Sequence, residues 1–186
     1  MIETPLGKAR YTPGAVVNWF LAQARTTKSK LDHIQLQRLM YFAHGRYLAE
    51  HNAPLVKEHA EAWEYGPIFP SVYHEYKKYG SSPLPLGEGA FMQELTRLPQ
   101  DPQKSVFRQH FIHVMDAKTE VLLKTVWKDY AKLSANEISD LARRARDDNP
   151  WIIYRHITER TGVNNIDIPN EMIRKYFVAV DQNTLP

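Results

Sequence analysis

The chain has 186 residues and no cysteine, and it also lacks any long apolar run. Without cysteine there are no disulfides, thiolate nucleophiles or cysteine-ligated zinc, which is typical of a reducing compartment. No stretch approaches the roughly 18 consecutive apolar residues of a membrane span, and the start, MIETPLGKAR, has neither the basic nor the apolar region of a signal peptide. We therefore expect a cytoplasmic protein without a membrane partner.

An excess of charge of one sign is missing as well. The 24 Lys and Arg residues face 21 Asp and Glu residues, so the formal net charge is only +3. The densest basic cluster, ARRAR at 142–146, is followed at once by Asp147 and Asp148. Proteins that bind nucleic acid mainly through electrostatics carry a larger or more clustered basic excess. Nucleic acid is therefore a disfavoured partner, and a DNA-binding autoregulator is only a distant alternative.

Sequence motifs of common catalytic sites are absent too. There is no Gly-x-Ser-x-Gly, no glutamate between two histidines at zinc-protease spacing, and the glycine-rich GEGAF at 87–91 lacks the Lys-Ser/Thr of a phosphate-binding loop. We predict no catalytic residue, no cofactor and no metal.

Two sets of residues keep a hydrolase open as a less favoured alternative. His110, His113 and Asp116 are spaced three apart, as helical metal ligands can be, but Asp116 is better explained as a helix cap. The run Glu58, Glu61 and Glu64 would need a cleft that places two carboxylates at a fixed separation, and a solvated acidic face explains it more simply.

What the sequence does contain is helical periodicity with well-formed helix starts. Thr12-Pro13 begins one helix, the capping pair Asp32 and Gln35 a second, Pro70 a third, Asp116 a fourth, the pair Ser134 and Glu137 a fifth, and Pro169 a last one. The pattern predicts a mainly α fold: a single globular helical domain with an irregular middle segment rich in Pro and Gly at 81–105. The short segment EAWEY, 61–65, allows one β element, and we expect turns at Gly66-Pro67 and Asn149-Pro150-Trp151.

Several motifs in order resemble the Panacea domain, an antitoxin family that includes SocA-like and GepA-type phage-associated proteins. The first is RLMYFAHG at 38–45, followed by APL at 53–55, AWEYGP at 62–67 and a helix that ends in Tyr79-Gly80. LSANEIS at 133–139, Pro150-Trp151 and IPNEMIRKYF at 168–177 continue the likeness. Two departures are mild: His44 stands where the family more often has Gln, and Ile138 where Leu is common. The resemblance places the domain at 12–178, with an N-terminal extension at 1–11 and a C-terminal tail at 179–186.

The resemblance implies a non-enzymatic antitoxin that binds and neutralises a toxin encoded beside it. An adaptor that delivers the toxin or another client to a cytoplasmic protease is the alternative, and self-association is left open. Family membership would not identify the toxin, because the family is associated with many unrelated toxin folds.

We interpret most residues of the family motifs as structural, with Trp63 as a core anchor. They are Leu39, Tyr41, Ala43, Gly45, Trp63, Tyr65, Gly66, Pro67, Tyr79, Gly80, Pro150 and Trp151. Gly45, in the middle of a helix, costs about 1 kcal/mol relative to alanine and indicates a close approach by another backbone. Partner contacts should come from exposed residues nearby, for which we select His44, His51, Tyr79 and the 81–95 loop.

Overall fold

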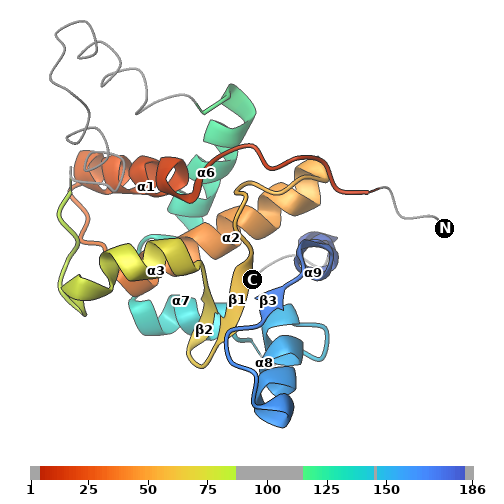
Figure 1. The fold of residues 1–186 in the computed structure, drawn as a ribbon. Coiled ribbons are helices and arrows are strands. Elements are labelled where there is room, and N and C mark those ends of the chain that lie inside the picture. The colour runs from red at the N-terminus through yellow and green to blue at the C-terminus, as the bar shows by residue number, and fades with distance from the viewer. Residues whose placement is uncertain (1–4, 87–114, 145, 183–186) are drawn as a thin grey trace, which may run out of the picture.

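The computed structural model describes residues 5–86, 115–144 and 146–182, which form a mainly helical fold with one small sheet (Figure 1). The predicted fold class is confirmed, whereas most of the predicted irregular segment falls outside the described residues. In chain order the elements are α1 (Pro13–Thr27), α2 (His33–His51), β1 (Ala60–Trp63), β2 (Gly66–Ile68), α3 (Pro70–Tyr76), the 3₁₀ turn η1 (Lys77–Tyr79), α6 (Ala117–Tyr130), α7 (Ala135–Ala142), α8 (Pro150–Thr161), β3 (Asp167–Ile168) and α9 (Asn170–Gln182). None of the described helices combines the length and the apolar character of a membrane span.

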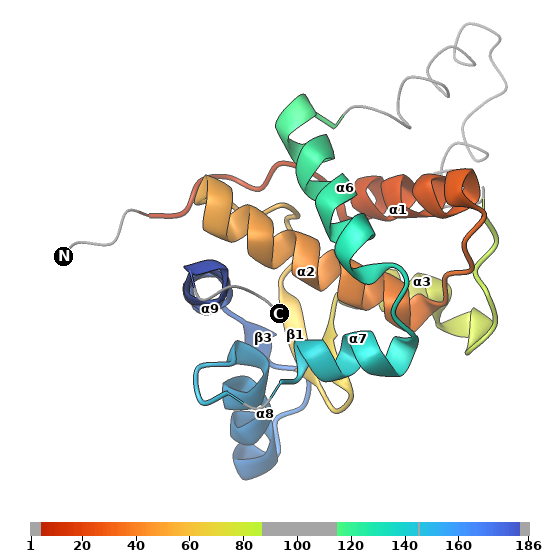
Figure 2. The ribbon, with the colours of Figure 1, turned by 180° about the vertical axis from the view of Figure 1, so that it is seen from behind.

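Helix α2 is the centre of the fold. Every residue from Leu36 to Leu48 is buried, because α1, α3, α6, α7 and α9 all pack against this helix. Figure 2 shows α2 crossing the middle of the molecule, with α6 and α7 on the near side. A helix buried on all sides belongs in a core, and its polar side chains then need partners inside the protein.

Pro70 begins α3 as predicted, and four other predicted helix starts are confirmed together with their side-chain caps. Asp32 and Gln35 form a reciprocal capping box at α2, and Ser134 and Glu137 form a second one at α7. Thr12 caps α1 through Ala15 N, and Asp116 caps α6 through Thr119 N. Each cap supplies acceptors for backbone N–H groups that a helix leaves unpaired at its first turn.

The sheet has the order β2-β1-β3, with both neighbours antiparallel to the central strand β1. Ala60 and Ala62 of β1 are fully buried and face the core, so the alternating residues Glu61 and Trp63 face outward. The sheet lies in front of α2 in Figure 1, with α8 below it. On this outward face both Glu61 and Trp63 are half-buried.

The prediction of a turn at Gly66-Pro67 is wrong. Both residues belong to β2, and the two-residue turn of the hairpin consists of Glu64 and Tyr65. Proline is tolerated in β2 because this is an edge strand, where the missing N–H is not needed for strand pairing.

The predicted turn at Asn149-Pro150-Trp151 is also wrong. Asn149 is the N-cap of α8, where its Oδ1 accepts a hydrogen bond of 3.0 Å from Trp151 N, and Pro150 is the first helical residue. Asparagine before proline therefore begins a helix here, because proline at this position lacks only an N–H that would have had no helical partner.

Gly45 does mark a close approach, but the neighbour is a side chain and not a backbone. A Cβ added at Gly45 would lie 2.2 Å from Cε2 of Phe177, so the ring from α9 occupies the space that any larger residue on α2 would need. The missing side chain thus allows the two helices to meet, which is consistent with the extensive contact between α2 and α9.

Candidate functional site

The β1–β2 hairpin is held by Arg38, a fully buried residue of α2. Its Nη1 donates to the carbonyl oxygen of Pro67, its Nη2 to that of Tyr65, and its Nε to Oγ of Ser139 on α7 at 3.1 Å. Burial, with a smaller contribution from Arg143, lowers the pKa of Arg38 to about 10, so the guanidinium stays charged at neutral pH. Buried charges are normally paired with a carboxylate. In the part of the chain that the structure describes, Arg38 forms no ion pair, and its guanidinium instead donates to carbonyl oxygens of the hairpin.

Gly66 explains how the guanidinium reaches the hairpin. Its φ is +128°, in the region that favours glycine, and a Cβ there would lie 2.4 Å from Nη2 of Arg38. The Gly-Pro pair of the family motif therefore leaves room for a buried cation.

The side chain of Gln37, the residue before Arg38, binds the backbone at the end of the same edge strand, β2. Its Oε1 accepts a hydrogen bond of 2.8 Å from Phe69 N, and its Nε2 donates one of 3.1 Å to Phe69 O. The amide thus replaces a neighbouring strand just beyond β2, where backbone groups would otherwise be buried without partners.

On the other side, Trp151 of α8 anchors β1. Its Nε1 donates a hydrogen bond of 2.8 Å to the carbonyl oxygen of Trp63. Between these supports the tip of the hairpin stays open to solvent, and Tyr65 is 68% exposed although Arg38 binds its carbonyl oxygen. A large aromatic side chain is therefore presented on a backbone that has little freedom to move.

Trp63 is not the core anchor that we expected. It is half-buried and lies on the outward face of the sheet, where its ring meets that of Tyr73 at 4.6 Å between centroids. Its Nε1 donates a hydrogen bond of 2.6 Å to Oε2 of Glu61 on the same face. The motif residues Leu39, Tyr41 and Ala43 are buried, in agreement with a structural role. That role stays a prediction for the motif as a whole.

The residues selected for partner binding do not come together. His44 is fully buried, so the expectation that it is exposed is wrong. Its Nε2 lies 2.8 Å from Oδ1 of Asn170, and burial lowers its pKa to about 4. His51 is half-buried at the end of α2, and Tyr79 is half-buried in η1, directly after α3. In Figure 1, α2 ends on the right of the molecule, whereas α3 lies on the left. Binding by His51 or Tyr79 stays a prediction, and the 81–95 loop lies mostly outside the described residues.

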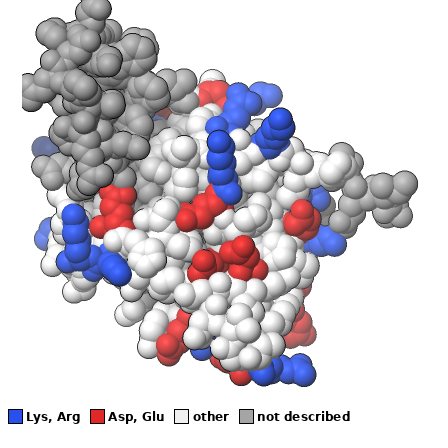
Figure 3. Space-filling model, in the orientation of Figure 1, with Lys and Arg blue, Asp and Glu red and all other residues white. Residues whose placement is uncertain are grey.

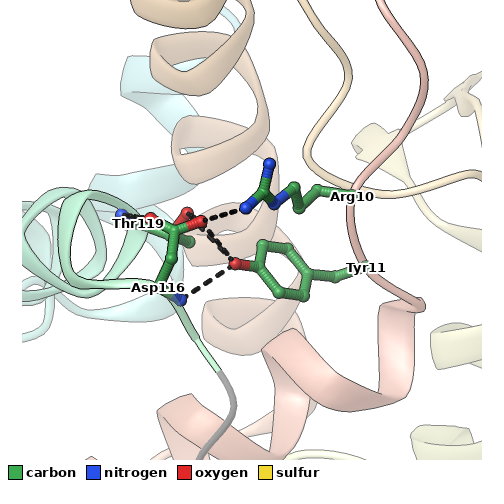
Figure 4. Close-up of polar contacts among 4 residues, drawn as sticks. All are labelled: Arg10, Tyr11, Asp116 and Thr119. Carbon is green, nitrogen blue, oxygen red and sulfur yellow. Dashed lines mark hydrogen bonds and ion pairs between the residues drawn. The ribbon is translucent and has the colours of Figure 1, made fainter.

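The second polar cluster joins the N-terminal segment to α6. Tyr11 Oη donates to Oδ2 of Asp116 at 2.9 Å, and Arg10 forms an ion pair of 3.3 Å with the same oxygen (Figure 4). The backbone N–H of Thr119, followed by these side chains, lowers the pKa of Asp116 to about 2. A cavity of about 440 Å³ lies beside this cluster and is also lined by Tyr47 and by His51. Asp116 therefore both caps α6 and binds the N-terminal segment to this helix.

Two members of the acidic run each have a partner of their own. Glu58 accepts hydrogen bonds from N and Oγ of Ser71 at the start of α3, and Glu61 accepts from Trp63. His110 and His113 lie outside the described residues. Within the described part of the chain, no cluster of three or more His, Asp or Glu side chains could hold a metal ion.

Taken with its open hairpin, this fold defines a small helical domain that presents a fixed aromatic surface. The family model described as "Antitoxin SocA-like, Panacea domain" matches residues 36–152, more than half of the chain, and the chain belongs to this family. Over 66 residues it is 41% identical to "Antitoxin SocA" of Caulobacter vibrioides (strain NA1000 / CB15N). That match covers 36% of this chain and 35% of the relative, so the chain spans about a third of the curated relative it matches. No solved structure matches the chain.

Proposed function

We propose that this protein is an antitoxin that neutralises a toxin encoded by an adjacent gene through direct protein–protein binding in the cytoplasm, without catalysis of its own. Its membership of an antitoxin family supports a toxin as the partner. The observation that carries direct binding is Tyr65, exposed on a hairpin whose backbone is bound by the buried Arg38.

The physical argument concerns the entropy cost of binding. Binding energy at interfaces is concentrated in a few residues, with Tyr, Trp and Arg enriched among them. Ordering a flexible loop or side chain on association weakens the complex, whereas a surface held in place beforehand avoids that cost. Tyr65 combines a large contact area with a fixed backbone, and the half-buried Trp63 lies two residues away on the same hairpin.

A paired assay tests the proposal. The product of the neighbouring gene is co-expressed with this protein, growth is measured, and the two proteins are co-purified. We expect rescue of growth together with a stable complex. Neither rescue nor complex would refute the proposal. Rescue that comes with no complex and a shortened toxin half-life would instead support the adaptor alternative.

Two alanine variants locate the contact. Tyr65→Ala should weaken the complex by about tenfold or more, as expected of an interface hot spot. Val121→Ala on α6 is the matched control, because Val121 is exposed to a similar extent, 65% against 68% for Tyr65. Both variants should keep the stability of the parent, since neither side chain is buried. If the two variants bind the toxin equally tightly, the hairpin is not part of the interface.

A further inference from the structure

The outward face of the sheet carries two carboxylates in an unfavourable arrangement. Glu61 of β1 and Asp167 of β3 are directly opposite each other in the antiparallel pairing, and opposed residues in such a ladder project from the same face. Like charges in this position destabilise a sheet. The fold itself therefore gives no reason for the pair, and a cation from outside would relieve the repulsion.

The surroundings of this pair are also acidic. Glu58 lies beside the start of α3, next to the sheet, and Glu64 is exposed in the hairpin turn. Figure 3 shows acidic side chains gathered over the centre of this face, while most basic side chains lie toward its margins. The chain as a whole has a formal charge of +3, so the composition does not account for an acidic surface here.

Aromatic rings flank Glu61. The indole of Trp63 donates to Glu61, which fixes both side chains, and Tyr73 packs against that indole. Ile68, which is opposite Glu61 on β2 and faces the same way, is only 4% exposed. The face thus offers Glu61, held by the indole, with the exposed Asp167 opposite it and aromatic rings beside it. This combination suits a guanidinium, because this group pairs with carboxylates through its planar fork and stacks on aromatic rings.

We propose that the outward face of the sheet docks a basic segment of the toxin, with an arginine side chain placed between Glu61 and Asp167 and against Trp63. Tyr65 then packs on the apolar surface beside that arginine. This inference rests on the proposed function, and it adds the chemistry of the partner: the bound segment is cationic, and electrostatic attraction accelerates the encounter and weakens with salt.

The test uses the full chain and the purified product of the adjacent gene. Glu61→Gln and Asp167→Asn are combined, because these amides keep the shape of the side chains, and the amide oxygen introduced on β1 can still accept from the indole of Trp63. The control combines Glu50→Gln and Glu120→Gln, which change the net charge equally and lie on α2 and α6, with side chains 51% and 43% exposed. Affinity is measured at two ionic strengths, and thermal stability is measured for each variant.

We expect the sheet variant to bind about tenfold or more weakly than the control variant and to lose much of its salt dependence. Its melting temperature should stay equal or rise, because a like-charge contact has been removed; a merely structural role would lower it. If the parental protein binds the toxin no more tightly than either variant, the docking surface is refuted, and the proposed antitoxin function is unaffected. No complex with the parental protein at all would overturn the proposed function together with it.

Discussion

Replacement of Gly45 by alanine gives the sharpest test of the packing between α2 and α9. The new Cβ would lie between 2.2 and 2.5 Å from three ring carbons of Phe177, well inside van der Waals contact. The ring cannot simply move away. Phe177 is 3% exposed and meets the rings of Tyr41, Phe42 and Tyr176 at centroid distances of 5.8, 6.1 and 5.5 Å.

Two effects of opposite sign decide the outcome. Alanine in a helix interior is favoured over glycine by about 1 kcal/mol. Overpacking of a closely packed core costs about 1–3 kcal/mol, and more where the neighbours cannot shift. Because three ring atoms are struck and the ring is enclosed, the second effect should dominate. We expect a net loss of about 2 kcal/mol, equivalent to a fall in melting temperature of about 4–8 °C for a chain of this length.

Urea unfolding followed by circular dichroism measures this loss, and the chain supplies its own control. Gly14 lies near the start of α1, where an added Cβ meets no atom within 4 Å, so Gly14→Ala should be neutral or slightly stabilising. Adding Phe177→Leu to Gly45→Ala should recover part of the loss, because the shorter side chain makes room. If Gly45→Ala proves as stable as Gly14→Ala, the packing argument is refuted.

Three further outcomes follow from the buried and capping groups. Arg38→Met leaves the buried carbonyl oxygen of Pro67 and the partly buried one of Tyr65 without this donor, so we expect a loss of about 2 kcal/mol or more in urea unfolding. Amide exchange should become faster first in the β1–β2 hairpin, and unchanged exchange there would contradict the role of Arg38. Asp116 has a pKa lowered to about 2, so its contribution to stability is complete above about pH 4 and is lost as the pH falls toward 2. The stability difference between the parent and Asp116→Asn should shrink over that range in acid titrations. A constant difference would argue against this role of the Asp116 carboxylate. His44 is buried with its pKa lowered to about 4, so the unfolded chain binds the proton first and stability falls as the pH drops from about 6.5 to 4. His44→Gln, measured by urea unfolding at pH 7 and pH 5, should remove part of that fall, and an equally steep fall would show that another group causes it.

Features that depend on neighbours in sequence could be predicted from the sequence. The capping pairs Asp32 with Gln35 and Ser134 with Glu137 form within one helical turn, so their residue types nearly determine their geometry. Gly66-Pro67 and Asn149-Pro150 were wrongly predicted as turns, although each pair stands at the start of an element. The local pattern could not show this for Gly66, because its positive φ is explained by a guanidinium that comes from another element.

The candidate site depends on residues far apart in the chain, and no local pattern indicates it. His44 is buried against Asn170, 126 positions later, so its helix alone could not distinguish a surface histidine from a core one. The pair formed by Glu61 and Asp167 arises only because the short strand β3 joins β1 from the C-terminal part of the chain. The sequence did contain Glu58, Glu61 and Glu64 as an acidic run, but it could not reveal the fourth carboxylate.

The AWEYGP motif now separates into residues that build the hairpin and residues that the hairpin presents. Ala62, Gly66 and Pro67 are buried, and each is explained by core packing or by the space that Arg38 needs. Tyr65 is not explained in this way, since its carbonyl oxygen binds Arg38 while its side chain points into solvent. Any residue in that conformation could supply the carbonyl, so the fold requires no tyrosine there. Under the proposed function, a toxin that packs against the ring would supply the reason, so Tyr65 is the first side chain to remove in a test of that interface.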